Sequence, residues 1–302
     1  MISPLPKPSR IFVPKPVPRP VYGPKVQRLP KRGSMTIAIG MMCNGGAIVA
    51  ADCLFVTLDG SKTRGRKVCM ANAPHIAFAI AQSSEDSNAA EGLVREISSK
   101  LGNPATVGWQ LFEAAIKSKM TEWHAAYGSL TPPTTQLIIG AAIPNQGTRL
   151  YFCQPPFTAL QKTGGYVSAG SGAAVADTLF NLLFTPAFKT QHIQVVLREI
   201  SYLMYRAKGI EGNAWCGGPT DAIYLDTQTS RTEWIYGNDF KSAEEASFQL
   251  DLILNTASTA ALSQSNQWFD ENVKSVGGVI RQCERLRETV FHDLHGRILG
   301  EK

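Results

Sequence analysis

The chain reads Met35-Thr36-Ile37-Ala38-Ile39-Gly40, then Gly46-Ala47-Ile48-Val49-Ala50-Ala51-Asp52, and then Arg66-Lys67-Val68. Asn44-Gly45-Gly46 separates the first two apolar runs, and a turn of this kind predicts a β-hairpin. Thr36 therefore heads one strand, Asp52 ends the next strand sixteen residues later, and Lys67 opens a further strand fifteen residues beyond that. Because adjacent strands lie about 5 Å apart, we expect these three strand ends to bring the side chains together.

The rest of the body alternates groups of strands with pairs of helices. Short apolar runs predict strands at 67–71, 75–81, 135–143, 149–153, 157–168, 220–226 and 231–236. Apolar residues at helical spacing predict helices near 90–101, 109–123, 172–184 and 193–204. This order favours two stacked sheets with a helical layer outside each, because a doubly wound parallel sheet would alternate single strands and helices.

Composition places the chain among globular proteins, with 302 residues of which 44% are hydrophobic and 18% charged. Its six cysteines are scattered without a CxxC pair, which argues for a reducing compartment and against a disulfide framework or structural zinc. No apolar run reaches the roughly 18 residues that a membrane helix needs. We therefore expect a cytoplasmic protein without a membrane partner.

The ends of the chain differ from its body. Residues 1–34 hold nine of the 18 prolines and eight Lys or Arg without an acid, and they predict a disordered or polyproline-type arm, or a propeptide. The remaining residues carry 22 basic and 24 acidic groups, so the body shows no charge excess for nucleic-acid binding. Residues 35–240 form the predicted domain, and 241–302 are predicted as a helical C-terminal extension in which an apolar stripe begins at Phe269.

Thr36 acquires a chemical role if it becomes the N-terminal residue. A threonine hydroxyl is a weak nucleophile that needs a base, and an α-amino group with a pKa near 7.7–8.0 can accept a proton at neutral pH. Lys67 would keep more of that amine neutral, and Asp52 would orient Lys67. The alternative is structural: a strand threonine, a turn-capping aspartate and a solvated lysine. Ser171, in Gly170-Ser171-Gly172, is either a helix N-cap or a hydroxyl that relays a proton.

These motifs resemble the proteasome β-subunit family of N-terminal nucleophile hydrolases, of the bacterial proteasome-related type, over about residues 36–236. The resemblance rests on the Thr36, Asp52 and Lys67 segments, on Gly170-Ser171-Gly172 and on Gly217-Gly218. It implies an α+β fold arranged as a four-layer αββα sandwich. It further implies that Thr36 is the nucleophile, that Asp52 and Lys67 are its charge pair, and that Ser171 assists in peptide-bond hydrolysis through an acyl-enzyme ester, with no metal or organic cofactor.

The chain departs from the active family pattern around three residues. Asn213 and Cys216 stand where active members have an aspartate and a serine, and Gln82 stands nearest to the glycine whose N–H forms the oxyanion hole. Any residue other than proline supplies an N–H, so the hole can survive this change. Phe55 and Ile80 fall where the resemblance places the substrate pocket.

Processing decides whether Thr36 can act. Gly33-Ser34-Met35 precedes it, so glycine, after which proteasome propeptides are usually cut, is not adjacent. If translation starts at Met35, removal of that methionine exposes Thr36.

Three hypotheses remain open at this point: a threonine peptidase of proteasome type, a non-catalytic proteasome-like subunit, and a tail-driven binder of acidic partners or proline-recognition domains. The first implies a peptide or unfolded-protein substrate and a ring-type homo-oligomer. Any ATP-driven unfolding of that substrate would need a separate ATP-dependent unfoldase as partner, because the chain has no phosphate-binding loop.

Overall fold

The structure is a computed structural model, and it describes residues 36–56, 61–73, 76–83, 89–101, 108–127, 135–154, 161–183, 189–209, 216–235, 240–248 and 251. The chain divides into two units, Met1–Arg32 and Gly33–Lys302, and every described residue lies in the second. The predicted proline-rich arm, most of the predicted C-terminal extension and Asn213 lie outside the described residues.

The Thr36 segment opens the first of two five-stranded sheets. Its strands run in the order β10-β1-β2-β11-β12, and every neighbouring pair is antiparallel. The predicted hairpin is confirmed as β1 and β2, joined at Asn44-Gly45, where Gly45 has a φ of 90°. The bounds are Ile37–Cys43 for β1, Gly46–Asp52 for β2, Tyr166–Gly170 for β10, Thr220–Asp226 for β11 and Arg231–Ile235 for β12.

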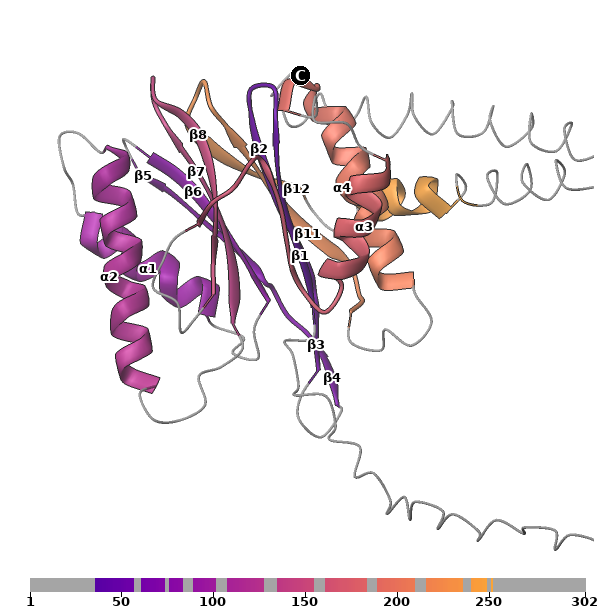
Figure 1. Cartoon of the computed structure of the whole chain (residues 1–302), viewed down its shortest axis with the longest axis horizontal. Coiled ribbons are helices and arrows are strands. Elements are labelled where there is room, and N and C mark those ends of the chain that lie inside the picture. Colours follow the sequence, from indigo (N-terminus) through magenta and orange to yellow (C-terminus); the bar gives the residue numbers. More distant parts are fainter. Residues whose placement is uncertain are drawn as a thin grey trace, which may run out of the picture. The chain divides into compact units, whose positions relative to one another are not determined.

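The second sheet has the order β5-β6-β7-β8-β9 and is also antiparallel (Figure 1). Its strands are β5 (Val68–Ala73), β6 (Ile76–Ser83), β7 (Gln136–Ile143), β8 (Gly147–Cys153) and β9 (Gln161–Lys162).

The prediction of a single strand at 157–168 was wrong in the number of strands. Its described part forms two short strands that belong to different sheets, β9 in the second and β10 in the first. Gly164 and Gly165 lie between these strands, and Gly165 has a φ of 112° that side-chain-bearing residues rarely adopt. The glycine pair thus lets the chain pass from one sheet to the other.

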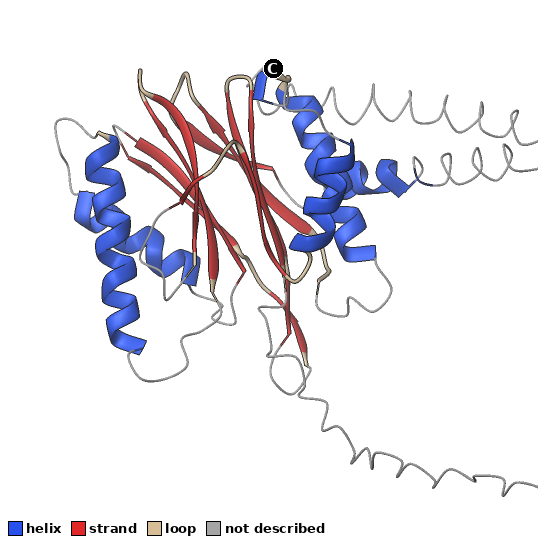
Figure 2. Ribbon diagram, viewed as in Figure 1, coloured by secondary structure: helices blue, strands red, loops and turns tan. Residues whose placement is uncertain are grey.

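All four predicted helices are present, and they lie on the two outer sides of the pair of sheets (Figure 2). Helices α1 (Ala89–Leu101) and α2 (Trp109–Tyr127) cover the second sheet, and α3 (Ala173–Leu183) and α4 (Ile193–Gly209) cover the first. Residues 240–248 are helical as well, and Phe240 packs into the core beneath α3 and α4.

Three apolar cores hold these elements together. One lies between the first sheet and α3 and α4, and another between the second sheet and α1 and α2. The third lies between the sheets and is rich in small side chains from both, including Ala38, Ala51, Ala79 and Ala81. Small residues allow the sheets to approach closely, so the strand ends that carry Thr36 and Lys67 meet across this core.

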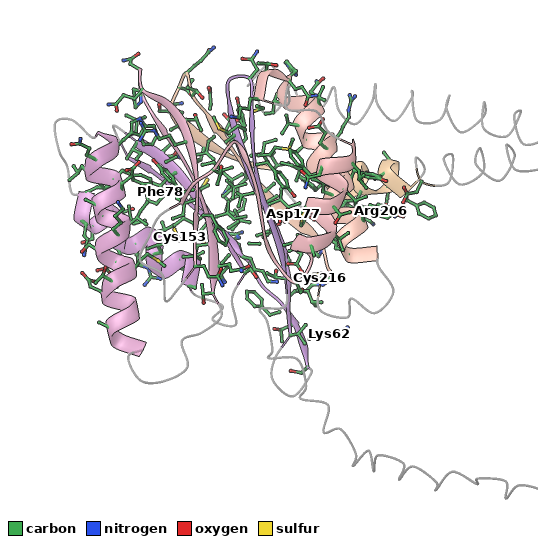
Figure 3. The ribbon with its side chains drawn as sticks, in the orientation of Figure 1. Lys62, Phe78, Cys153, Asp177, Arg206 and Cys216 are labelled. Carbon is green, nitrogen blue, oxygen red and sulfur yellow. The ribbon has the colours of Figure 1, made fainter. Side chains whose placement is uncertain are left out.

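A two-stranded hairpin that the sequence analysis did not predict follows Asp52. It pairs β3 (Leu54–Val56) with β4 (Lys62–Arg64), and it projects beyond the end of the sheets near Cys216 (Figure 3). Its first strand is half-buried and its second is exposed. The hairpin places Leu54 and Phe55 beside Lys67.

Candidate active site

Three elements from two sheets converge at the predicted site. Thr36 immediately precedes β1, Asp52 ends β2, and Lys67 immediately precedes β5. The exposed fractions of the three residues are 1%, 0% and 1%. The structure therefore brings together the three residues that sequence spacing singled out, in an interior with almost no contact with solvent.

The Thr36 hydroxyl is held by both partners. It donates a hydrogen bond to Oδ1 of Asp52 and accepts one from Nζ of Lys67. Its position is fixed further by the backbone, because the carbonyl of Thr36 accepts from the Gly172 N–H at 3.3 Å. Hydrogen bonds to its hydroxyl and to its main-chain carbonyl thus orient Thr36, the candidate nucleophile.

Lys67 has an acceptor for each of its ammonium protons. Nζ donates to Thr36 Oγ1, to Asp52 Oδ1 at 2.9 Å and to the carbonyl of Leu54. The ring of Phe55 lies over the ammonium, 4.8 Å from Nζ to the ring centroid. Burial lowers the pKa of Lys67, and the Asp52 carboxylate opposes that shift. Three acceptors and an aromatic face are the surroundings of a charged ammonium.

The Asp52 carboxylate receives four hydrogen bonds. Oδ1 accepts from Thr36, from Lys67 and from the Ile37 N–H at 3.1 Å, and Oδ2 accepts from the Gly217 N–H at 2.9 Å. A buried carboxylate is tolerated when it is paired and its oxygens are satisfied, and both conditions hold here. Asp52 is therefore the common acceptor for the threonine, the lysine and two backbone groups.

Ser171 and Cys216 lie on the carbonyl side of Thr36. Ser171 Oγ donates to the Thr36 carbonyl at 3.3 Å, and the Ser171 hydroxyl and Cys216 thiol are 3.2 Å apart. Cys216 is 6% exposed. Ser171 therefore touches the carbonyl oxygen of Thr36 and not its hydroxyl, and Cys216 touches Ser171.

Gly170 explains why this loop is rich in glycine. Its φ is 94°, and a methyl group added there would collide with the carbonyl oxygen of Thr36. The Gly170 N–H donates to Gln136 Oε1 at 2.7 Å, which ties the loop to β7 in the second sheet. Only a residue without a side chain fits between Thr36 and this tether.

Gln82 and Ile80 have other surroundings than the sequence analysis expected. The Gln82 N–H donates to the carbonyl of Lys67 at 2.9 Å, so in this structure it is engaged in strand pairing and does not point into an oxyanion hole. Its side chain accepts from the Ala90 N–H at the start of α1. Ile80 is fully buried in the core beneath α1 and α2, so its placement supports a packing role and not a substrate-pocket role. Phe55 remains half-buried beside Lys67.

Sequence reasoning missed the backbone groups of the site. The Leu54 carbonyl and the N–H groups of Ile37 and Gly217 contact Lys67 or Asp52. Gly217-Gly218 is one of the motifs on which the resemblance rests, and in the structure it marks the loop that reaches Asp52, where Gly218 has a φ of 72°. The Gly217-Gly218 pair indicated a turn before a predicted strand, but the sequence did not indicate which backbone groups contact Lys67 or Asp52.

Comparison with known proteins identifies the fold alone. No family model and no curated protein matches the chain. Among solved structures, an Anbu (Gly-1) mutant from Hyphomicrobium sp. strain MC1 matches with a TM-score of 0.60 and 15% identity, over 76% of this chain and all of that one. Anbu, an ancestral beta-subunit, from Yersinia bercovieri matches with a TM-score of 0.56 and 15% identity, over 70% of this chain and 92% of that one.

A third match is the helical assembly of the Anbu complex from Pseudomonas aeruginosa, with a TM-score of 0.53 and 11% identity, over 83% of this chain and 96% of that one. These likenesses agree with the mixed architecture of helices and antiparallel sheets. At such identities, residue roles have to be argued from the site itself. Of the helices in the described part of the chain, none is both long and apolar enough to cross a membrane.

Proposed function

We propose that the chain is a proteasome-type threonine peptidase, with the four-layer αββα sandwich of N-terminal nucleophile hydrolases and with Thr36 as its nucleophile once the preceding residues are removed. The observation that carries this proposal is the contact of the Thr36 hydroxyl with both Lys67 and Asp52 in a buried site. An ordinary strand threonine has no need of a buried ion pair at its hydroxyl, because burying two charges costs free energy that the fold must offset.

The proposed reaction begins with attack of Thr36 Oγ1 on the carbonyl carbon of a peptide bond. The hydroxyl proton passes to the free α-amine of Thr36, and the resulting α-ammonium gives a proton to the departing amine of the substrate as the C–N bond breaks. An ester between Thr36 and the acyl part of the substrate remains. Water, deprotonated by the same α-amine, then hydrolyses the ester and regenerates the threonine.

Lys67 is assigned an electrostatic role in this scheme. Its three protons already have the acceptors Thr36, Asp52 and Leu54, and the loss of one proton would leave a neutral amine beside a buried carboxylate. A charged Lys67 disfavours protonation of a neighbouring amine, which keeps the α-amine available as a base. Asp52 holds Lys67 in place at 2.9 Å.

Access to the nucleophile is part of the proposal. With the chain continuing on the N-terminal side of Thr36, that residue is 1% exposed and its nitrogen belongs to a peptide bond. A peptide nitrogen cannot accept the proton, so the full chain is the inactive form. Initiation at Met35 followed by methionine removal gives the free amine that the proposed reaction needs.

The remaining features of the proposal are a peptide or unfolded-protein substrate, self-assembly and a cytoplasmic site of action. A neighbour of the same fold is described as a helical assembly, so the oligomer formed here is either a ring or an open helix. Five cysteines lie in the described residues and no two of these five form a disulfide, which fits a reducing compartment. The predicted division into an arm, a domain at 35–240 and a C-terminal extension is kept as part of this proposal.

The test compares two forms of the protein, residues 1–302 and residues 36–302 with a verified N-terminal threonine. Each is treated with an electrophilic probe that forms a covalent bond with N-terminal threonine, and the adduct is located by mass spectrometry. We expect labelling at Thr36 in the shorter form and none in the longer form or in Thr36→Ala. Absence of labelling on a proven Thr36 terminus would support the non-catalytic subunit instead.

A further inference from the structure

A second charge pair adjoins the loop that contacts Asp52. Lys208 belongs to the last turn of α4, and Glu244 belongs to the helical segment 240–248. Lys208 Nζ lies 2.6 Å from Glu244 Oε1, and the two side chains are 12% and 16% exposed. This pair is mostly removed from water and lies in elements that contribute no residue to the proposed catalytic group.

The Lys208–Glu244 pair holds one side of loop 216–220, the segment that leads into β11, through hydrogen bonds. Besides Glu244, Lys208 Nζ donates to the Gly218 carbonyl at 3.0 Å and to Thr220 Oγ1 at 2.5 Å. The Thr220 hydroxyl in turn donates to Glu244 Oε1 at 2.6 Å, and Thr220 is fully buried. The ammonium therefore joins a loop carbonyl, a strand hydroxyl and a helix carboxylate.

The other side of the same loop contacts the segment that carries Asp52. The Gly217 N–H donates to Asp52 Oδ2 at 2.9 Å, and the Cys53 N–H donates to the Pro219 carbonyl at 3.0 Å. Thr220 is also the register partner of Asp52 in the pairing of β11 with β2. Loop 216–220 is thus held between the Lys208–Glu244 pair and the Asp52 carboxylate.

We propose that Lys208 and Glu244 are positioning residues for Asp52, and that they act by fixing loop 216–220 so that the Gly217 N–H stays on Asp52 Oδ2. The inference rests on the proposed function for its catalytic consequence, since Asp52 orients both Thr36 and Lys67. Neither Lys208 nor Glu244 touches those residues. The C-terminal helical segment becomes, through Glu244, part of the support of the site.

The loop has a backbone that needs such support. Gly217 and Gly218 lack side chains, and Gly218 has a φ of 72°, so neither residue packs an apolar group that would hold the loop. The hydrogen bonds to Lys208 and Asp52 hold Gly218 and Gly217 themselves, and the bond from the Cys53 N–H holds the Pro219 carbonyl next to them. Loss of the lysine would free the Gly218 carbonyl and loosen the turn that presents the Gly217 N–H.

The experiment uses the full chain and residues 36–302 and compares four variants. Lys208→Met removes the hydrogen bonds from the ammonium to the loop, and Lys208→Arg keeps a positive charge at this position. The double variant Lys208→Met/Glu244→Met removes both charges, so that no buried charge is left unpaired. Lys241→Met is the matched control, because Lys241 pairs with Glu245 in the same helical segment but the two are 71% and 65% exposed. Amide hydrogen exchange across 216–220 is measured in each, together with the rate of probe labelling at Thr36.

We expect the rate of amide hydrogen exchange in 216–220 to rise about tenfold in Lys208→Met and in the double variant, because each loses a hydrogen bond to a charged group. The exchange rates in β1 and β7 should stay unchanged. Lys208→Arg should restore most of the protection, and Lys241→Met should match the wild type. In residues 36–302 the maximal labelling rate should fall about tenfold in the same two variants, while the probe concentration for half-maximal rate stays constant.

Unchanged exchange in 216–220 in both Lys208→Met variants would overturn the proposal. So would fast exchange with an unchanged labelling rate, because the loop would then have no influence on the site. If the wild type itself is not labelled, the proposed peptidase function fails, and exchange of the Gly217 amide still decides whether Lys208 holds that N–H on Asp52.

Discussion

The Nζ atom of Lys67 lies 2.9 Å from Oδ1 of Asp52, and both side chains are almost completely buried. Each charge compensates the other in a region where an isolated charge is costly. The pair also contacts the Thr36 hydroxyl, so its integrity affects stability and the proposed chemistry together. Substitutions can separate these two effects.

Removing one partner should destabilise the fold more than removing both. Asp52→Asn and Lys67→Met each leave one buried group uncompensated, and we expect each to lower the free energy of unfolding by about 3–5 kcal/mol. The double variant Asp52→Asn/Lys67→Met should be more stable than the less stable single variant. Urea unfolding of the three variants and the wild type checks this.

The exposed pair formed by Arg95 and Glu91, at 78% and 57% exposure, supplies the control. Arg95→Met should change the free energy of unfolding by less than about 1 kcal/mol. Additive losses in the Asp52/Lys67 double variant would show that the two groups do not compensate each other.

A second prediction concerns Gly170, whose missing side chain makes room for the Thr36 carbonyl. Gly170→Ala adds a methyl group that collides with this carbonyl, at a φ of 94°. Gly147→Ala places the same group at a φ of 84° with nothing within 4 Å. Gly147→Ala should cost about 1–2 kcal/mol from backbone strain. Gly170→Ala should cost about 1–3 kcal/mol more from overpacking, as measured by urea unfolding.

Probe labelling distinguishes displacement of Thr36 from simple destabilisation. In the folded protein that consists of residues 36–302, Gly170→Ala should lower the rate of probe labelling at Thr36, while Gly147→Ala should leave this rate unchanged. Equal stabilities and equal labelling for the two variants would mean that the loop yields without disturbing Thr36.

Much of the fold was predictable because most helices and strands are indicated by the residue pattern within their own segment of the chain. The turn at Asn44-Gly45 between two apolar runs predicted β1 and β2, and apolar residues at helical spacing predicted α1 to α4. The convergence of Thr36, Asp52 and Lys67 followed from their places at strand ends. The hairpin and the helices depend on contacts between residues close in sequence, whereas Lys67 meets Thr36 and Asp52 from the other sheet.

What sequence could not supply was the orientation of uniformly apolar strands and the use of backbone groups. In β6, Phe78 and Ile80 face the helices and Ala79 and Ala81 face the other sheet, so large and small residues alternate where polar and apolar ones do not. The structure, and not the sequence alone, shows that this alternation places Ile80 in the core beneath the helices. Nearly every residue has a backbone N–H and every residue has a backbone carbonyl. The residue types at Gly217 and Leu54 therefore do not indicate that these two groups contact the site.

A third prediction tests the contact between Ser171 and Cys216. Cys216→Ser keeps a small donor at the position 3.2 Å from Ser171 Oγ, whereas Cys216→Ala removes it. Labelling of Thr36 in residues 36–302 should stay near the wild-type rate in Cys216→Ser and fall about fivefold in Cys216→Ala, which corresponds to one hydrogen bond of about 1 kcal/mol. Cys69→Ala, at a half-buried free cysteine in β5, should leave the rate unchanged. A larger loss with serine than with alanine would contradict the assigned contact.

A fourth prediction concerns pH and a carboxyl group far from the proposed chemistry. Glu199 in α4 is 8% exposed, and burial raises its pKa to about 7, although a hydrogen bond from Gln191 opposes the shift. The folded state therefore binds a proton more tightly than the unfolded state, whose pKa is about 4.5. The contribution of this group to stability is fully present below pH 4.5 and is lost as pH rises towards 7.

Glu199→Gln replaces the carboxyl with a neutral group of similar shape, so it should abolish this dependence. The free energy of unfolding of the variant relative to the wild type should increase between pH 5 and about pH 7 and level off above it, where the carboxyl is ionised in both states. Glu233→Gln provides a comparison at a second carboxyl whose pKa burial raises. Urea unfolding at several pH values measures the difference. A constant difference across this range would show that Glu199 is already ionised in the folded protein and that Gln191, with solvent, compensates its charge.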